Sequence, residues 1–302
     1  MRFSPDEKPA TVLGHQSMLS CQDKIYSMLK ITSYDPITRI DLARTLARRG
    51  RYWTTAYLVD GLLVDSGCAY SAPELLKYLT DKSLTQLVNS HTHEDHIGAN
   101  GCLQSVNDEL KILAHPLALP VLAEPHAKQP LHPYRRLMWG WPEPSQGEQI
   151  ADGEVIRTEN FSFQVIYTPG HSPDHICLYE PECGWLFSGD LFVGGHDRAL
   201  SADADIWGVI ESLKRIADLP LSKLFPGSAR VRENPRNELL EKITYLEAMG
   251  ERVLELHRNG ESASAIARIL FDGPMFIEAI TLGHFSRKYL VRSYLRKFET
   301  SV

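Results

Sequence analysis

The stretch from Val88 to Asn100, VNSHTHEDHIGAN, concentrates side chains that can bind metal ions. Three imidazoles and two carboxylates fall within the six residues that begin at His91, directly after an apolar run. Imidazole nitrogens and carboxylate oxygens bind zinc and similar divalent ions at about 2 Å. The His-x-His-x-Asp-His spacing lacks the i, i+4 histidine pair of a zinc-binding helix, so it favours a loop that curls around metal. A surface loop with unrelated histidines is the alternative.

Two further candidate ligands stand in equivalent places along the chain. His171 follows a predicted strand and a Thr-Pro-Gly turn in VIYTPGHSPDH, and Asp190 follows a strand and a glycine in WLFSGD. Glycine lets the backbone come close to a bound group, and functional side chains gather on loops that a rigid scaffold positions. We therefore group His171 and Asp190 with the histidine cluster.

Short apolar runs that alternate with turns predict a mixed α/β body that positions these side chains. YWTTAYLVDGLLVDSG predicts a hairpin around Asp60-Gly61, and SAPELLKYLTD predicts a helix that begins near Ser71. Further strands are expected in LTQLVNS, DELKILAHP, FSFQVIYTPGH, ICLYE and GWLFSGD. The proline-rich segment Leu119–Gln149 predicts a long loop, which is either a lid over the site or the cover of a small secondary core.

The sequence changes character after Pro235. Three segments carry apolar residues at helical spacing: RNELLEKITYLEAMGERVLELHRNG, SASAIARILF with Ser262 as a helix N-cap, and HFSRKYLVRSYLRKF. We therefore predict one mixed α/β domain at residues 1–235 and a helical appendage at residues 236–302. SASAIARILF also faintly resembles the second helix of a winged-helix unit.

Taken together, HTHEDHIGAN, TPGHSPDH and FSGD resemble the metallo-β-lactamase superfamily, especially its glyoxalase II-like hydrolases, over about residues 25–230. The resemblance implies a four-layer αββα sandwich whose catalytic domain, residues 1–235 here, carries two divalent ions, zinc before iron or manganese. The implied ligands are His91, His93 and His171 for one ion, and Asp95, His96 and the bridging Asp190 for the other. It also implies a metal-bridging hydroxide as nucleophile, with Asp95 as the catalytic residue that orients it or handles the leaving-group proton.

One position departs from the family's pattern. Where the family carries a further histidine for the second metal, this chain reads KLFPGSARVREN, with Ser228 in that place. A neutral hydroxyl is a weaker ligand than imidazole. We therefore expect a second site of reduced affinity, with a mononuclear site as the alternative. Another histidine could also complete the second site, and the candidates are His115, His175, His196 and His284.

The composition is that of an ordinary globular protein, with 43% hydrophobic and 23% charged residues in 302. A net charge of -6 gives no electrostatic case for nucleic acid as the main partner. The amino-terminal residues lack the apolar core of a signal peptide, and no apolar stretch reaches membrane-span length. The cysteines are scattered without a CxxC pair, which favours a reducing, cytoplasmic compartment. They are Cys21, Cys68, Cys102, Cys177 and Cys183.

The motifs define a reaction centre more closely than a substrate. The leading hypothesis is hydrolysis of a small ester, thioester or lactone, with a homodimer as the assembly to test, and the alternative is a metal-dependent endoribonuclease or phosphodiesterase. Candidate pocket residues are Arg135, Arg136, His196, Asp197 and Arg198, and the tail's basic residues are Arg287, Lys288, Arg292, Arg296 and Lys297. The acidic net charge favours the small molecule. A purely structural metal site is disfavoured because no cysteine lies in the motifs, and an iron redox protein because no flavin domain is present.

Overall fold

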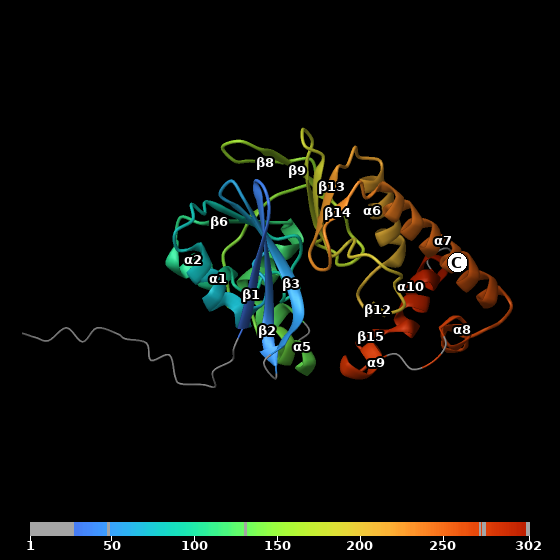
Figure 1. Cartoon of the computed structure of the whole chain (residues 1–302). Coiled ribbons are helices and arrows are strands. Elements are labelled where there is room, and N and C mark those ends of the chain that lie inside the picture. Colours follow the sequence, from blue (N-terminus) through green and yellow to red (C-terminus); the bar gives the residue numbers. More distant parts are fainter. Residues whose placement is uncertain (1–26, 47–48, 130–131, 272, 274–275, 300–302) are drawn as a thin grey trace, which may run out of the picture.

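The computed structural model describes residues 27–46, 49–129, 132–271, 273 and 276–299. The predictions made for the amino-terminal residues and for Cys21 lie outside this part of the chain. Two sheets stack face to face between layers of helices, and the C-terminal helices extend one side of the sandwich (Figure 1). The predicted four-layer αββα architecture is therefore confirmed.

The first sheet has seven strands in the order in which they occur along the chain. They are β1 (Ser27–Tyr34), β2 (Ile37–Leu46), β3 (Arg49–Val59), β4 (Leu62–Val64), β5 (Gln86–Val88), β6 (Lys111–Ala114) and β7 (Glu148–Gln149). The pairs from β1 to β4 are antiparallel, and those from β4 to β7 are parallel. The predicted hairpin is present, because Val59 pairs with Leu62 across a two-residue turn. Asp60 and Gly61 both have positive φ there, as such turns require.

The second sheet has six strands in the order β14-β13-β11-β10-β9-β8. Their bounds are β8 (Val155–Arg157), β9 (Ser162–Tyr167), β10 (Ile176–Glu180), β11 (Trp185–Gly189), β13 (Lys223–Pro226) and β14 (Arg232–Glu233). Side chains that point between the sheets form an aromatic core around Tyr57, Phe187 and Phe225. The Tyr57 ring lies 5.3 Å from Phe187 and 5.5 Å from Phe225 between ring centroids. This packing fixes the relative position of the two sheets, which matters because each sheet supplies part of the site.

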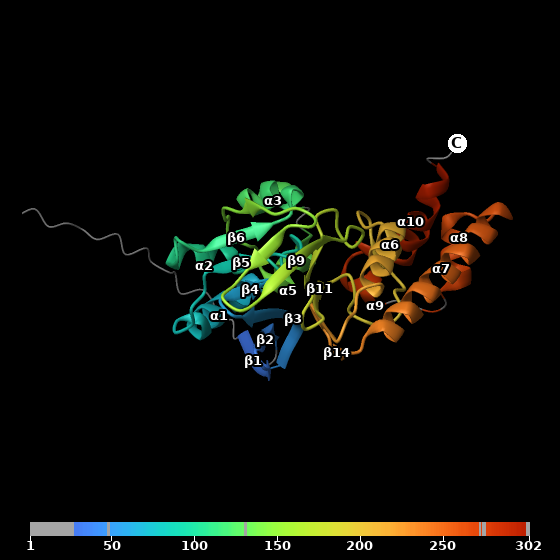
Figure 2. The same ribbon diagram turned by 90° about the horizontal axis from the view of Figure 1, so that it is seen from above.

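Helices cover the outer face of each sheet (Figures 1 and 2). On the first sheet lie α1 (Ala72–Leu79) and α2 (Asn100–Val106), whose apolar residues join one cluster with those of the sheet. On the second sheet lies α6 (Ile206–Ala217), which Asp205 caps by accepting a hydrogen bond from the backbone N–H of Trp207. Among the described helices, none is both long enough and apolar enough to span a membrane.

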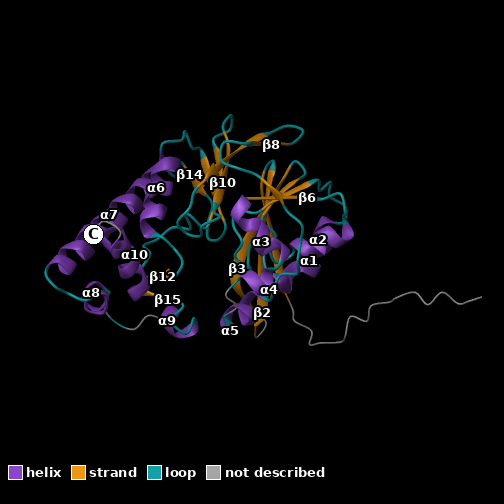
Figure 3. Ribbon diagram, turned by 180° about the vertical axis from the view of Figure 1, so that it is seen from behind, coloured by secondary structure: helices purple, strands orange, loops and turns teal. Residues whose placement is uncertain are grey.

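The proline-rich segment is helical, which corrects the predicted long loop. It contains α3 (Leu119–Ala123), α4 (Pro125–Lys128) and α5 (Pro133–Trp139), which the view from behind shows (Figure 3). Helices α3 and α4 contact each other, whereas α5 contacts β2 and β3. Each of these helices carries a proline in its first two positions. There a proline costs no hydrogen bond, because the first N–H groups of a helix have no partner within it. The prolines therefore begin helices here, whereas the sequence analysis interpreted them as breaks.

The C-terminal segment packs against α6 and the second sheet. It comprises α7 (Arg236–Arg258), α8 (Ala263–Leu270), α9 (Phe276–Ile280), β15 (Phe285–Ser286) and α10 (Arg287–Glu299). Ser262 caps α8 as predicted, since its hydroxyl accepts from the backbone N–H of Ala265. Among the described residues of this segment, the one strand pairs with β12 (Leu200–Ser201) of the body and builds no separate wing. The winged-helix resemblance and the division into two domains stay predictions.

Candidate metal centre

The six predicted ligands follow strands of both sheets at one edge of the sandwich. His91, His93, Asp95 and His96 follow β5, whereas His171 follows β9 and Asp190 follows β11. Gly189 allows the close approach before Asp190: it has a φ of 48°, and a Cβ there would lie 2.6 Å from Nε2 of His175. The chain therefore needs glycine at this turn, as the sequence pattern predicts.

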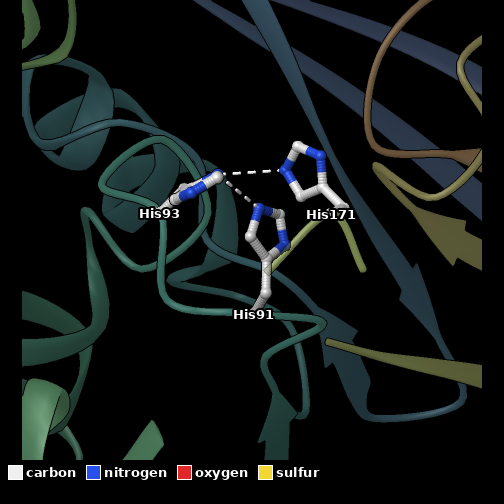
Figure 4. Close-up of side chains that lie close together, drawn as sticks. All are labelled: His91, His93 and His171. Atoms are coloured by element: carbon white, nitrogen blue, oxygen red, sulfur yellow. Dashed lines mark hydrogen bonds between the residues drawn. The ribbon is translucent and has the colours of Figure 1, made fainter. Parts of the chain in front are cut away.

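The imidazoles of His91, His93 and His171 converge on one point (Figure 4). Nδ1 of His93 lies 2.9 Å from Nε2 of His91 and 3.0 Å from Nε2 of His171. Ligand atoms that share an ion at about 2 Å lie roughly 3 Å apart, so these separations suit one metal ion. Burial, followed by the neighbouring imidazoles, lowers the pKa of His91 and His93 well below the usual value. Both rings are therefore neutral, which is the form that binds metal.

A second group of metal-binding atoms comes from His91, His96 and Asp190, which lie within 4.8 Å of one another. Oδ2 of Asp190 lies 3.5 Å from Nε2 of His96 and 3.8 Å from Nε2 of His171. Asp190 thus stands between the two groups, where the resemblance expects a bridging carboxylate. Asp95 lies at the margin, with Oδ2 3.9 Å from Nε2 of His96. The structure brings all six residues together, and their ligation of metal stays a prediction.

The charges of the second group fit a cation. Burial alone would lower the pKa of His96, but the carboxylates of Asp65, Asp190 and Asp95 raise it well above its usual value, so a metal ion that binds Nε2 would displace a proton from this ring. Burial opposes ionisation of Asp190, yet His96 and His171 hold the pKa of that carboxyl far below its ordinary range. Oδ1 of Asp190 is buried and has no hydrogen-bond partner among the described residues. A buried carboxylate oxygen without a donor is stabilised by a metal ion, so the donor set fits the predicted centre.

Asp65 supports the second group and was missed by the sequence analysis. Its Oδ2 lies 2.7 Å from Nδ1 of His96, and its two oxygens accept from the backbone N–H and the hydroxyl of Ser90. A carboxylate on one ring nitrogen leaves the other nitrogen of His96 free to face the site. The signal available was LLVDSG, in which an acid stands at a strand end beside a serine and a glycine; the motif SGD that contains Asp190 has the same three residue types in another order.

His175 positions Asp190 and does not replace the missing ligand. It is fully buried, its Nε2 accepts from the backbone N–H of Asp190 at 3.2 Å, and its Nδ1 lies 2.8 Å from the hydroxyl of Thr168. Both ring nitrogens therefore have partners.

The other three histidines proposed as replacements lie outside both ligand groups found among the described residues. His115 stacks on Tyr167, His196 stacks on Tyr245, and His284 is hydrogen-bonded to Tyr134. Each ring thus has an aromatic or hydrogen-bonding partner away from the predicted ligands. The idea that one of these histidines completes the second site is therefore wrong for this structure.

The sequence model of the metallo-β-lactamase superfamily matches residues 50–228, which include every predicted ligand. The chain belongs to this superfamily. Curated members of the superfamily resemble it over part of their length. It is 28% identical to the thioesterase pkgB of Emericella nidulans over 73% of this chain and 61% of that protein. It is 32% identical to the hydroxyacylglutathione hydrolase of Maricaulis maris over 46% of this chain and 45% of that enzyme. The chain thus spans less than two thirds of either relative.

Solved metallo-β-lactamase structures share the fold. A beta-lactamase domain protein from Burkholderia ambifaria superposes with a TM-score of 0.67 at 17% identity, over 89% of this chain and 88% of that one. The protein TTHA1623, solved in a di-iron-bound form, superposes with a TM-score of 0.52 at 30% identity, over 63% of this chain and 94% of that one. The first likeness establishes the architecture alone. The second structure is that of a relative solved with two bound iron ions.

The turn after β13 reaches the second group in this superfamily member, as its motif predicts. A Cβ on Gly227 would lie 2.5 Å from Oδ1 of Asp190 and 2.7 Å from Cε1 of His96. Ser228 follows directly and is half-buried. The site thus has a serine where the resemblance expects the third ligand of the second ion.

Substitution Ser228→His is expected to tighten the second metal ion by about tenfold, a difference of about 1.4 kcal/mol. The added imidazole would supply a ligand that the hydroxyl supplies poorly. Competition with a chromophoric zinc chelator measures the affinity. The control is Ser222→His, because Ser222 lies before β13, at the opposite end of the strand from Ser228, and its hydroxyl donates to the carbonyl of Cys183. Equal zinc affinity in Ser228→His and the parent protein would contradict the assignment of this turn.

A pocket of about 200 Å³ opens beside the first group, with His93 in its wall. Lys128, Arg135, Asp174 and Asp203 bring charges of both signs to its lining. Arg135, one of the predicted pocket residues, is buried and paired with Glu94 at 2.6 Å. The pocket is thus built partly from the helical segment that the sequence predicted as a lid or a core cover.

The remaining predicted pocket residues have other partners. The guanidinium of Arg136 lies over the ring of Trp141, 4.7 Å from its centroid. Asp197 pairs with Lys242 of α7 at 2.9 Å. Neither Arg136 nor Asp197 lines the pocket beside the first group. Their contacts join surface segments to Trp141 and to α7.

Proposed function

We propose that this protein is a metal-dependent hydrolase of small thioesters. The observation that carries the proposal is the pair of overlapping ligand groups, His91–His93–His171 and His91–His96–Asp190, beside a pocket of about 200 Å³. Two of the curated relatives are a thioesterase and a hydroxyacylglutathione hydrolase. A pocket of this size suits a small acyl group or part of a thiol carrier.

Metal binding, orientation of the ligands and proton transfer are assigned to different residues. The imidazoles of His91, His93, His96 and His171 and the carboxylate of Asp190 would hold two divalent ions. Asp65 would fix the orientation of His96, and His175 that of Asp190. Ions held there would lower the pKa of water and polarise the thioester carbonyl. Asp95, at the margin of the second group, is our candidate to orient the water and to pass its proton to the departing thiolate.

The ribonuclease alternative has less support. Two of the basic tail residues have internal partners: Arg287 pairs with Glu278 at 2.9 Å, and Arg296 donates to the carbonyls of Ala202 and Ala204. Lys288 and Arg292 are exposed but stand in a chain whose net charge is -6. A nucleic-acid site usually needs a broader basic surface.

The deciding experiment measures thiol release from acyl-glutathione and acyl-coenzyme A thioesters by the zinc-loaded protein. A β-lactam, a lactone and a single-stranded RNA are assayed in parallel. We expect thioester cleavage that chelation abolishes and zinc restores. RNA cleavage that falls steeply with added salt, without thioester turnover, would overturn the proposal.

Elemental analysis of the unchelated protein comes before these assays. About two zinc ions per chain would support the binuclear centre and show that Ser228 permits a second ion. One ion per chain would favour a mononuclear site at the three imidazoles. Iron would direct the search to redox substrates.

A further inference from the structure

A buried ion pair joins the ligand loop to α5. Glu94 lies between two predicted ligands and is only 1% exposed, and its Oε2 accepts from Nη1 of Arg135 on α5 at 2.6 Å. Burying both charges is costly unless they remain paired. The loop backbone is held by the same segment, since Gln129 donates to the carbonyl of Thr92. Gln129 and Arg135 therefore hold the loop at two points.

The contact continues from α5 into the C-terminal segment. Nε of Arg135 donates to the hydroxyl oxygen of Tyr134 at 3.2 Å, and this oxygen lies 2.6 Å from Nδ1 of His284. Arginine can only donate, so the Tyr134 oxygen accepts from Arg135, and its own proton can be donated to Nδ1 of His284. That arrangement requires a neutral imidazole. Burial, with the nearby Arg135 cation, lowers the pKa of His284 to about 4, so the ring is neutral near pH 7.

His284 is itself held in a well-bonded turn between α9 and β15. Its backbone N–H donates to the carbonyl of Thr281 at 3.0 Å, and the Thr281 hydroxyl accepts from the backbone N–H of Phe285 at 3.1 Å. Phe285 then pairs with Ser201 in the two-stranded sheet that joins the tail to the body. The ring of His132 lies 4.0 Å from that of His284 and closes its other side.

We propose that His284 is a positioning residue through which the C-terminal helical segment fixes the metal-binding loop, by way of Tyr134, Arg135 and Glu94. All four side chains are at most 9% exposed, and each is bonded to the next. The inference rests on the proposed function in so far as the loop binds metal. The C-terminal segment would then hold the metal-binding loop in position, although it contributes no ligand to the groups found among the described residues.

The test compares two tyrosine-to-phenylalanine variants of the full chain. Tyr134→Phe removes the hydroxyl that joins Arg135 to His284. Tyr294→Phe is the matched control, because its buried hydroxyl donates to the carbonyl of Leu246 at 2.8 Å within the tail packing. Zinc alone is the probe, and its affinity is measured by chelator competition. Contacts that orient ligands typically change metal affinity by about 10- to 100-fold. We expect about tenfold weaker zinc binding in Tyr134→Phe and unchanged binding in Tyr294→Phe.

Variants at His284 separate positioning from general stability. In His284→Gln the side-chain carbonyl can still accept from Tyr134, so zinc affinity should stay within about threefold of the parent, whereas His284→Leu should lose about tenfold. Amide hydrogen exchange of residues 88–100 should quicken in His284→Leu and Tyr134→Phe only. Equal zinc affinity and equal exchange in all four variants would overturn the proposal. If the parent protein binds no zinc, the proposed function fails, and the exchange rates alone still decide whether the tail holds the loop.

Discussion

Asp190→Asn is expected to lower thioester hydrolysis by about 1,000-fold or more and to remove one metal ion per chain. The carboxylate lies 3.5 Å from His96 and 3.8 Å from His171, so it faces both ligand groups at once. A neutral amide removes the negative charge that two cations would share. The metal contribution is worth several kcal/mol, and about 1.36 kcal/mol corresponds to a tenfold change in rate.

Metal content by elemental analysis and turnover of a thioester are the two measurements. Asp197→Asn is the control, because Asp197 lies in the same loop but pairs with Lys242. It should keep both metal and activity. Full metal content together with near-normal turnover in Asp190→Asn would contradict the role assigned to Asp190.

Asp65→Asn is expected to weaken the second metal ion by about 10- to 100-fold, the range typical of groups that orient a metal-binding histidine. Oδ2 of Asp65 accepts from Ser90 and lies 2.7 Å from Nδ1 of His96. An amide NH₂ in that place can only donate. It would drive the His96 proton onto Nε2, the nitrogen that faces Asp190, and that nitrogen could then bind no metal.

The substitution itself should cost little backbone strain. Asp65 has a φ of 60°, and asparagine tolerates this left-handed conformation better than other residues with a side chain. Asp60→Asn is the matched control, since Asp60 also has a positive φ, of 48°, and lies in the hairpin turn. Zinc titration of both variants measures the effect. A second-ion affinity that is equal in the two variants would rule out tautomer control by Asp65.

Much of the fold was predictable because the sequence marks it locally. The hairpin at Asp60-Gly61, the N-cap at Ser262 and the strands before each ligand motif all depend on neighbouring residues. The helices of Leu119–Gln149 were missed because the effect of proline depends on its position in a helix. A proline in the helix interior breaks the helix, whereas a proline in the first turn is compatible with it.

The ligands were recognisable because each lies in a short motif at a strand end. Asp65 and the chain from Glu94 to His284 were not recognisable, because their contacts join residues that are far apart in sequence. Tyr134 and His284 are separated by 150 positions, and the contact exists only once α5 and the tail have packed. Ser228 was noticed as a missing ligand, but the replacements suggested for it could not be tested against burial or partners until the structure was known.

Both sheets supply residues to the site. His91, His93 and His96 follow a strand of the first sheet, whereas His171 and Asp190 follow strands of the second. An ion bound by both sets would link the two halves of the sandwich. Binding to the folded state alone adds about 2.7 kcal/mol when the free ion is at 100 times its dissociation constant. Metal supply would then govern how long the protein survives proteolysis, and a cell short of the ion would lose the protein as well as its activity.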